Sequence, residues 1–291
     1  MITIILLPLS QSVEQDMSTD VLIDISKELD VKYGNPEVQA ESFLGLLDEN
    51  NVSYEFTENG QALDGLELKD YKLLILWDPD ESYQPEELEA VHEYVKGGGT
   101  LLYAGNSYSN TSADVFDNIN EMLSAYGITL VREMMIDTTD YVGCHCGTTP
   151  VLSDFIAEEY LYNVSALAAS HTMRFEYEDP AYAIAWGDDD AFIDSDGDEM
   201  HDDNEMIGHI PVIVKSHYGK GTVIAFGTEK MFENAYILRE ENEIFAVNIV
   251  MDTISDYTKE AGGGFPAYII PVLVLVCAAL VAGGYFISKR R

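Results

Sequence analysis

Apolar residues in the first half of the chain alternate between short continuous runs and helical spacing. The runs in Asp20–Ser26 (DVLIDIS) and Tyr71–Trp77 (YKLLILW) are typical of strands that are buried on both faces. Between these runs, apolar residues recur three and four positions apart, as on the buried face of a helix. The expected strands are Asp20–Ser26, Ser53–Thr57, Tyr71–Trp77, Thr100–Gly105 and Ile128–Glu133, and the expected helices are Asn35–Asn50, Pro85–Lys96 and a segment capped by Ser112.

The same pattern returns later in the chain. Tyr182–Trp186, Ile210–Ser216 and Thr222–Gly227 are expected strands, and a helix is expected over Glu241–Tyr257. The segment 134–179 shows no such pattern, and no element is predicted there. Strands that alternate with helices favour a parallel sheet covered on both faces. The sequence therefore predicts an α/β domain with a doubly wound, mainly parallel, flavodoxin-like sheet.

A long apolar segment lies near the C-terminus. Phe265–Ile287 contains no charge over 23 residues, and a membrane-spanning helix needs about 20. The basic tail at 288–291 (SKRR) places the C-terminus in the cytoplasm and the preceding domain outside. We expect a retained, single-pass transmembrane helix, rather than a processed C-terminal signal. The short tether at 259–264 would keep the domain close to the lipid bilayer.

The N-terminal residues allow two interpretations. Met1–Ser12 (MITIILLPLSQS) is apolar but lacks the basic residues with which a signal peptide begins. Residues 1–19 are therefore either the remnant of an export signal or an N-terminal strand, and the ectodomain is expected over 20–258. Three glycosylation sequons agree with export: Asn51, Asn110 and Asn163.

The charge balance restricts the partners of the chain. There are 52 acidic and 15 basic residues, which gives a net charge of −37. Such a surface repels nucleic acid and attracts cations. The expected partners are the lipid bilayer and proteins of the cell envelope or of a transporter.

One acidic segment carries a metal-binding pattern. Residues 176–205 contain 13 acidic side chains and no Lys or Arg. From Asp194, carboxylates occupy positions 1, 3, 5, 9 and 12 and a backbone carbonyl is available at position 7, as in EF-hand calcium loops. Position 6, which is normally glycine, is Glu199. The expected Ca²⁺ ligands are Asp194, Asp196, Asp198, Met200, Asp202 and Glu205.

The segment GCHCG leaves three states open for Cys144 and Cys146. The two thiols can form a local disulfide, hold a soft metal together with His145, or stay unpaired. A closed zinc site needs four ligands, and only three are present here.

Two stretches resemble a known superfamily. They are YKLLILWDPDESYQPEELEAVHEYVKGGGTLLYAGNSY at Tyr71–Tyr108 and GHIPVIVKSHYGKGTVIAFGTEKMFENAYI at Gly208–Ile237. Both are similar to class I glutamine amidotransferase-like domains, in particular to a membrane-anchored archaeal and bacterial branch related to the accessory domain of gliding-type ABC transporters. The resemblance implies a nucleophilic cysteine after the strand TLLYAG, where this chain has Gly105, Asn106 and Ser107. It therefore implies a catalytically degenerate fold.

The expected function is that of a membrane-anchored extracellular binding or interaction module with a calcium loop. Two alternatives come from other classes of protein. One is an extracellular hydrolase that uses Ser107 or the GCHCG segment, with His217 as a candidate partner. The other, implied by the resemblance, is an accessory subunit of an ABC-type transporter.

Overall fold

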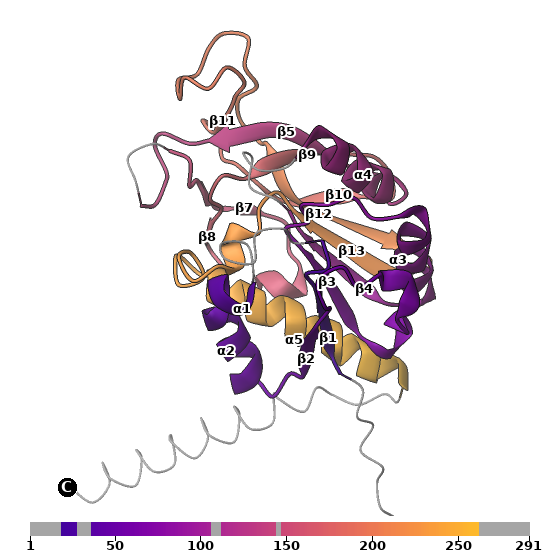
Figure 1. Ribbon diagram of the computed structural model, residues 1–291. Helices are drawn as coiled ribbons and strands as arrows, with labels where there is room; N and C mark the ends of the chain where they lie inside the picture. The colour runs from indigo at the N-terminus through magenta and orange to yellow at the C-terminus, as the bar shows by residue number, and fades with distance from the viewer. Residues whose placement is uncertain (1–18, 28–35, 106–111, 144–146, 262–291) are drawn as a thin grey trace, which may run out of the picture.

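The continuous apolar runs form the central strands of an eight-stranded sheet. The computed structural model describes residues 19–27, 36–105, 112–143 and 147–261 (Figure 1). The strands lie in the order β2-β1-β3-β4-β13-β12-β10-β7; the first five are parallel, and each later strand is antiparallel to its neighbour. Their bounds are β1 Val21–Asp24, β2 Tyr54–Phe56, β3 Leu73–Trp77, β4 Thr100–Ala104, β7 Asp154–Phe155, β10 Tyr182–Trp186, β12 Pro211–Tyr218 and β13 Gly221–Phe226.

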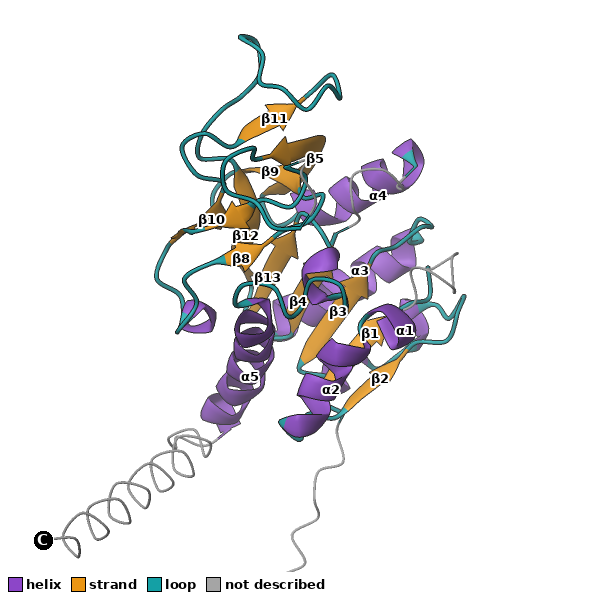
Figure 2. Ribbon diagram, turned by 90° about the vertical axis from the view of Figure 1, so that its left-hand side faces the viewer, coloured by secondary structure: helices purple, strands orange, loops and turns teal. Residues whose placement is uncertain are grey.

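Helices cover both faces of this sheet. α2 and α5 pack on one face through Phe43 and Phe245, and α3 and α4 pack on the other through Val91 and Ile119 (Figure 2). The α-helices are α1 Pro36–Gln39, α2 Glu41–Glu49, α3 Pro85–Gly97, α4 Ala113–Ser124 and α5 Asn242–Ala261. Single 3₁₀ turns are η1 Leu63–Gly65, η2 Leu68–Asp70, η3 Glu159–Leu161 and η4 Lys230–Phe232.

A second, antiparallel sheet lies beside the first. Its order is β11-β5-β9, with β5 Ile128–Ile136, β9 Met173–Tyr177 and β11 Phe192–Asp194. A small pair consists of β6 Val151–Leu152 and β8 Leu167–Ala168. The expectation that the strand at 128–133 joins the parallel sheet is wrong. In this strand Ile128 and Leu130 are buried while Thr129 is exposed, the alternation of a half-covered antiparallel strand.

The fold class is thus mixed α/β, with one large and mainly parallel sheet and smaller antiparallel ones. Within the part of the chain that the structure describes, no helix is long and apolar enough to cross a bilayer. The expected span Phe265–Ile287 and the N-terminal segment 1–18 lie outside the described residues.

Candidate functional site

The predicted calcium loop is fixed at both ends to strand β11. Asp194, the last residue of β11, is 3% exposed. The chain leaves the body of the protein there, at the top of Figure 1, and returns at Met206, whose carbonyl accepts a hydrogen bond from Ile193 N at 2.8 Å. Ile207 then forms a bridge with Phe192. The loop is therefore closed at its base.

Backbone amides of the loop gather around the carboxylate at position 1. Asp194 Oδ1 accepts from Gly197 N at 2.7 Å and from Asp198 N at 3.2 Å. Asp194 Oδ2 accepts from Glu199 N at 3.3 Å. These bonds fold residues 194–199 into a tight turn, which is how a short acidic loop brings its oxygens to one centre.

The structure brings three predicted ligands together. Asp194, Asp196 and Asp198 each offer an oxygen atom, and these atoms lie within 4.8 Å of one another. The hydrogen bond from Asp198 N lowers the pKa of Asp196, but desolvation and the charges of the neighbouring carboxylates outweigh it and raise that pKa. The like charges therefore repel each other in the absence of a cation.

The other predicted ligands are placed differently. Glu205 Oε1 accepts from Ser195 N at 2.6 Å, and its Oε2 accepts from Asp202 N at 3.1 Å. Glu205 thus ties the end of the loop to its beginning. Asp202 and Met200 are exposed, and the Asp202 carboxylate does not belong to the converging set.

The residue at position 6 adopts the conformation that the missing glycine would supply. Glu199 has φ 60, in the left-handed region, and Gly197 has φ 83. A side chain in this region costs on the order of 1 kcal/mol. The loop therefore keeps the turn that glycine would form at position 6, and Glu199 adds local strain to it.

A second candidate site is the carboxyl edge of the parallel strands, where open α/β sheets bind ligands. The helix after β1 covers one face and the helix after β3 covers the other, so the crevice lies between these two strands. Asp24 at the end of β1 accepts hydrogen bonds from Tyr83 Oη at 2.7 Å and from Thr57 Oγ1 at 2.8 Å, and all three residues are buried. Within the described residues, these buried side chains of the protein itself occupy the crevice.

A buried ion pair covers the same crevice. Lys27 Nζ lies 2.8 Å from Glu87 Oε2, and it also lies 5.4 Å from the centre of the Tyr83 ring. Burial raises the pKa of Glu87, but Lys27 and the amides of Gln84 and Leu63 outweigh it and hold that pKa below its usual value. Glu87 is thus a carboxylate whose charge is fully compensated.

Glu229 lies further along this edge, after β13, and its charge is less well compensated than that of Glu87. It is 2% exposed, and its Oε1 lies 3.1 Å from Lys230 Nζ. Among the described residues, Glu229 Oε2 has no hydrogen-bond partner. Burial raises the pKa of Glu229 to about 7, although Lys230 opposes the shift. The sequence reasoning missed this residue; its only signal was an acidic residue three positions after the end of a buried strand.

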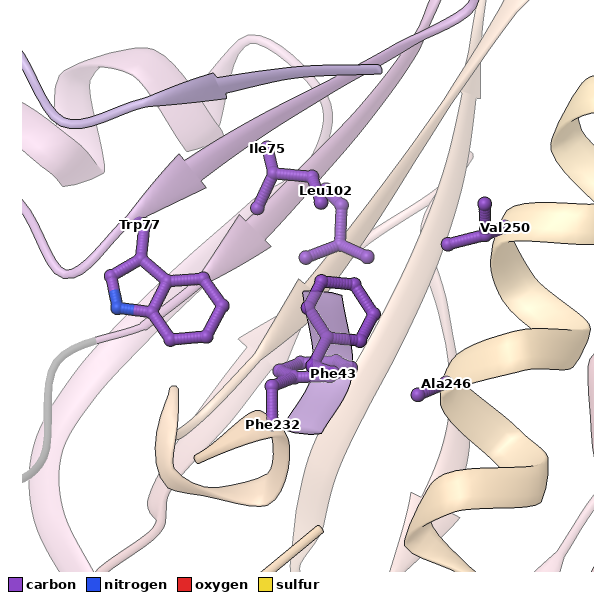
Figure 3. A pocket seen from close by; sticks show the side chains of 7 residues that line it. All are labelled: Phe43, Ile75, Trp77, Leu102, Phe232, Ala246 and Val250. Atoms are coloured by element: carbon purple, nitrogen blue, oxygen red, sulfur yellow. The ribbon is translucent and has the colours of Figure 1, made fainter. Parts of the chain in front are cut away.

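An apolar gap lies between the sheet and α5 (Figure 3). It is too narrow to admit a water molecule, and no polar side chains converge on it. It is a packing defect of the core rather than a ligand site. Its lining consists of Phe43, Ile75, Trp77, Leu102, Phe232, Ala246 and Val250.

The remaining candidates are scattered. His217 pairs with Thr222, which pairs with Thr100 at the start of β4. His217 therefore lies at the amino edge of the parallel strands, about 16 Å along the sheet from Gly105. Asn51 and Asn163 are exposed, with φ 57 and φ 60. Ser107, Asn110, Cys144 and Cys146 lie outside the described residues.

Comparisons with known proteins place the fold. A family model described as a domain of unknown function, DUF4350, matches residues 39–250. No curated protein matches the chain. The mmIFT52 N-terminal domain is 18% identical, with a TM-score of 0.65, over 80% of this chain and 97% of that one.

Two further solved structures are similar. The cytoplasmic protein STM1381 from Salmonella typhimurium LT2 is 13% identical, with a TM-score of 0.50, over 80% of this chain and 99% of that one. A ThuA-like protein from Bacteroides uniformis ATCC 8492 is 11% identical, with a TM-score of 0.49, over 80% and 90%. At these identities the likeness concerns the fold alone.

These findings overturn the resemblance to class I glutamine amidotransferase-like domains. The matching family, the mmIFT52 N-terminal domain and STM1381 point to a different fold, and they give no support for an amidotransferase. The two stretches that carried the resemblance form β3, α3 and β4 and the β12–β13 hairpin. A buried strand, a glycine-ended helix and a glycine turn are required by many α/β sheets, so they do not identify one family. The role as an accessory subunit of a transporter was implied by this resemblance alone and loses its basis.

Proposed function

The chain belongs to the family of the domain of unknown function DUF4350, and from this premise we propose that it is a membrane-anchored extracellular binding or interaction module stabilised by Ca²⁺. The observation that carries the proposal is the convergence of Asp194, Asp196 and Asp198 in a loop closed on β11. Carboxylates at this spacing supply the oxygen ligands that Ca²⁺ prefers.

The charge around the loop supports a cation. Residues 176–205 contain no Lys or Arg, and their one basic side chain is His201. Among the described residues, no Lys, Arg or His forms an ion pair with Asp194, Asp196 or Asp198. A bound divalent ion would remove the mutual repulsion of these carboxylates.

The filled crevice supports a binding role over a catalytic one. A catalytic pocket at the switch point needs room for a substrate, and Asp24, Tyr83 and Thr57 occupy that room with hydrogen bonds to one another. The strand order β2-β1-β3-β4-β13 supports the finer description of the sheet as doubly wound and flavodoxin-like. Interaction would then use the loops at the edges of the sheets.

The anchor is proposed from the sequence. Helix α5 ends at Ala261, and three glycines separate it from the apolar segment that starts at Phe265. A helix over Phe265–Ile287 would cross the bilayer and leave the basic tail in the cytoplasm. The domain would then lie close to the outer lipid surface.

The Ca²⁺ proposal is tested by thermal unfolding of the purified chain in EGTA and in millimolar Ca²⁺. Ca²⁺ is expected to raise the Tm, because an ion that binds only the folded state stabilises it. The double substitution Asp194→Ala with Asp196→Ala should reduce the rise, because it removes two ligands of the loop. Asp64→Ala with Asp117→Ala removes the same charge from exposed positions and should leave it intact. A wild-type Tm that does not change when Ca²⁺ is added would contradict the proposal.

The anchor is tested by fractionation of cells that express the full chain or residues 1–261. The full chain should remain in the membrane until detergent is added, and the shorter chain should not. Protease added to intact cells should degrade the domain. A full chain that behaves like the shorter one would contradict the anchor.

The alternative, an extracellular hydrolase, has one observation in its favour. Glu229 is buried at the carboxyl edge with a pKa of about 7, which suits a general acid or base. Its test is the hydrolysis of p-nitrophenyl esters and glycosides by the purified chain. Turnover that Glu229→Gln abolishes would establish the hydrolase and displace the binding module.

A further inference from the structure

A second set of carboxylates meets outside the predicted calcium loop. Asp137, Asp188 and Asp190 each offer an oxygen atom, and these atoms lie within 4.8 Å of one another. Asp137 directly follows β5, and the other two lie in the turn between β10 and β11. The pairing of Ile136 with Phe192 brings the turn and the end of β5 together. We call these three residues the Asp137 cluster.

Asp137 is the buried member of the cluster and is only half satisfied. It is 1% exposed. Its Oδ1 accepts from Thr139 N and from Asp140 N, both at 2.8 Å. Its Oδ2 is buried and has no hydrogen-bond partner among the described residues. A buried carboxylate oxygen without a donor is costly unless a cation or a proton compensates it.

The other hydrogen bonds of the cluster do not remove this deficit. Thr139 Oγ1 lies 3.1 Å from Asp137 Oδ1 and 2.9 Å from Asp190 Oδ2, but its single hydrogen can serve only one of them at a time. Asp188 Oδ1 accepts from Ala191 N at 3.0 Å. In the part of the chain that the structure describes, no Lys, Arg or His forms an ion pair with these carboxylates.

We propose that the Asp137 cluster binds a divalent cation with a preference for oxygen ligands, Ca²⁺ in particular, as a site distinct from the loop at 194–205. Two ligands of one Ca²⁺ ion lie at most about 5 Å apart, twice the Ca–O distance. The separations in the cluster satisfy this limit. The donors in the described part of the site are all oxygen, which favours Ca²⁺ or Mg²⁺ over transition metals.

The two cation sites would hold opposite ends of one strand. Asp190 precedes β11 and Asp194 ends it, so they are four positions, or about 13 Å of extended chain, apart. After the loop, the chain returns beside the start of β11, where Gly208 N donates to Ala191 O at 2.7 Å. An ion in the Asp137 cluster would fix the base of the loop at 194–205, and an ion bound by the loop itself would fix its tip.

The test counts Ca²⁺ ions bound by the full chain in detergent, after treatment with a chelator, by equilibrium dialysis. Wild type should bind two. Asp137→Asn should bind one, and so should Asp194→Ala with Asp196→Ala; the triple variant should bind none. Asp189→Asn is the matched control, because Asp189 lies between two members of the cluster but outside it, with a side chain that is 95% exposed. It should still bind two.

The outcomes separate this site from the loop. A wild type that binds one ion, lost in the Asp194/Asp196 variant and kept in Asp137→Asn, would overturn the second site and leave the loop standing. A second variant covers misfolding of the first. Asp188→Asn should raise the Tm in EGTA, by relief of repulsion, and reduce the rise produced by Ca²⁺. An equal increase in Tm with and without Ca²⁺ would show an acidic cluster that binds no ion.

Discussion

The carboxylates of the parallel sheet and those of the antiparallel sheet lie in opposite surroundings. In the parallel part, Asp24 accepts from two hydroxyls, and Glu87 pairs with Lys27. Beside β11, the carboxylates of the Asp137 cluster and of the loop at 194–205 face each other. Both parts bury charge. Arg174 pairs with Glu133 and Glu176 in the antiparallel sheet, but among the described residues no Lys or Arg forms an ion pair with the carboxylates that converge beside β11.

The difference indicates where each part obtains its stability. A buried charge that is matched within the fold needs nothing from solution. Carboxylates that converge without a basic partner store repulsion, which an ion from solution can relieve. The parallel part is therefore expected to be insensitive to Ca²⁺, and the β11 region is expected to depend on it. Four substitutions or treatments test this contrast.

The largest effect is expected from Asp24→Ala. The change leaves the buried hydroxyls of Tyr83 and Thr57 without their acceptor, at about 1–3 kcal/mol each. We expect a loss of about 3–5 kcal/mol in the free energy of unfolding, measured with urea, and the same loss in EGTA and in Ca²⁺. Asp24→Asn retains an acceptor and should cost less. A loss that depends on Ca²⁺ would break the comparison.

Glu229 is an exception within the parallel part, because a proton compensates it. Burial raises its pKa to about 7, above the ordinary 4.5. Between these two values the folded state binds more protons than the unfolded state, so stability falls as the pH rises through this window. Glu229→Gln should flatten this decline and raise the free energy of unfolding above pH 7 by about 3 kcal/mol.

Urea unfolding at several pH values from 4 to 8 measures the effect of Glu229→Gln. Glu67→Gln, at a side chain that is 74% exposed, is the control and should keep the wild-type profile. A wild type whose stability does not fall between pH 4.5 and pH 7 would show that Glu229 keeps its charge, and that Lys230 compensates it fully.

Proteolysis of the loop at 194–205 is expected to show the next effect. Glu199 is exposed in this loop and is a site for a glutamate-specific protease. Because Ca²⁺ would hold the loop closed, cleavage after Glu199 should slow about tenfold or more in Ca²⁺, which corresponds to about 1.4 kcal/mol. Cleavage after Glu58, an exposed residue of the parallel part, should not change. Equal slowing at both positions would contradict a local effect.

The sequence predicted the parallel part well for a physical reason. Strands such as Leu73–Trp77 are buried on both faces, so each is a continuous apolar run that local reading detects. The helix expected over 35–50 is divided at Ala40 into α1 and α2, a tertiary detail without a local signal. The strands β6, β7 and β8 have two residues each and are too short to show a period.

The candidate sites, like the strands and helices, were predictable only where the signal is local in the sequence. Asp194, Asp196 and Asp198 are close in sequence, so their spacing alone predicted that they converge. Asp137 and Asp188 are 51 positions apart, and only the pairing of β5 with β11 brings them together. The compensation of Asp24 by Tyr83 is likewise a contact between distant residues. Sequence patterns find sites that are built from one loop and miss those that depend on topology.

The smallest effect concerns the strained residue of the loop. Glu199 has φ 60, and glycine adopts this conformation without the steric cost of a side chain. Relief of the strain is worth on the order of 1 kcal/mol, and the greater freedom of glycine in the open loop offsets part of it. Glu199→Gly should therefore raise the affinity for Ca²⁺ by about threefold, measured by calorimetric titration.

A matched control distinguishes this strain from a general effect of charge or flexibility. Asp203 is exposed in the same loop, and its φ is not positive. Asp203→Gly removes one negative charge, as Glu199→Gly does, but relieves no strain, so it should weaken Ca²⁺ binding. If both variants weaken binding alike, the loop binds its ion without the left-handed turn at Glu199. A rise that is confined to Glu199→Gly would show that a strained turn, and not the count of carboxylates alone, limits how tightly the β11 region holds its ion.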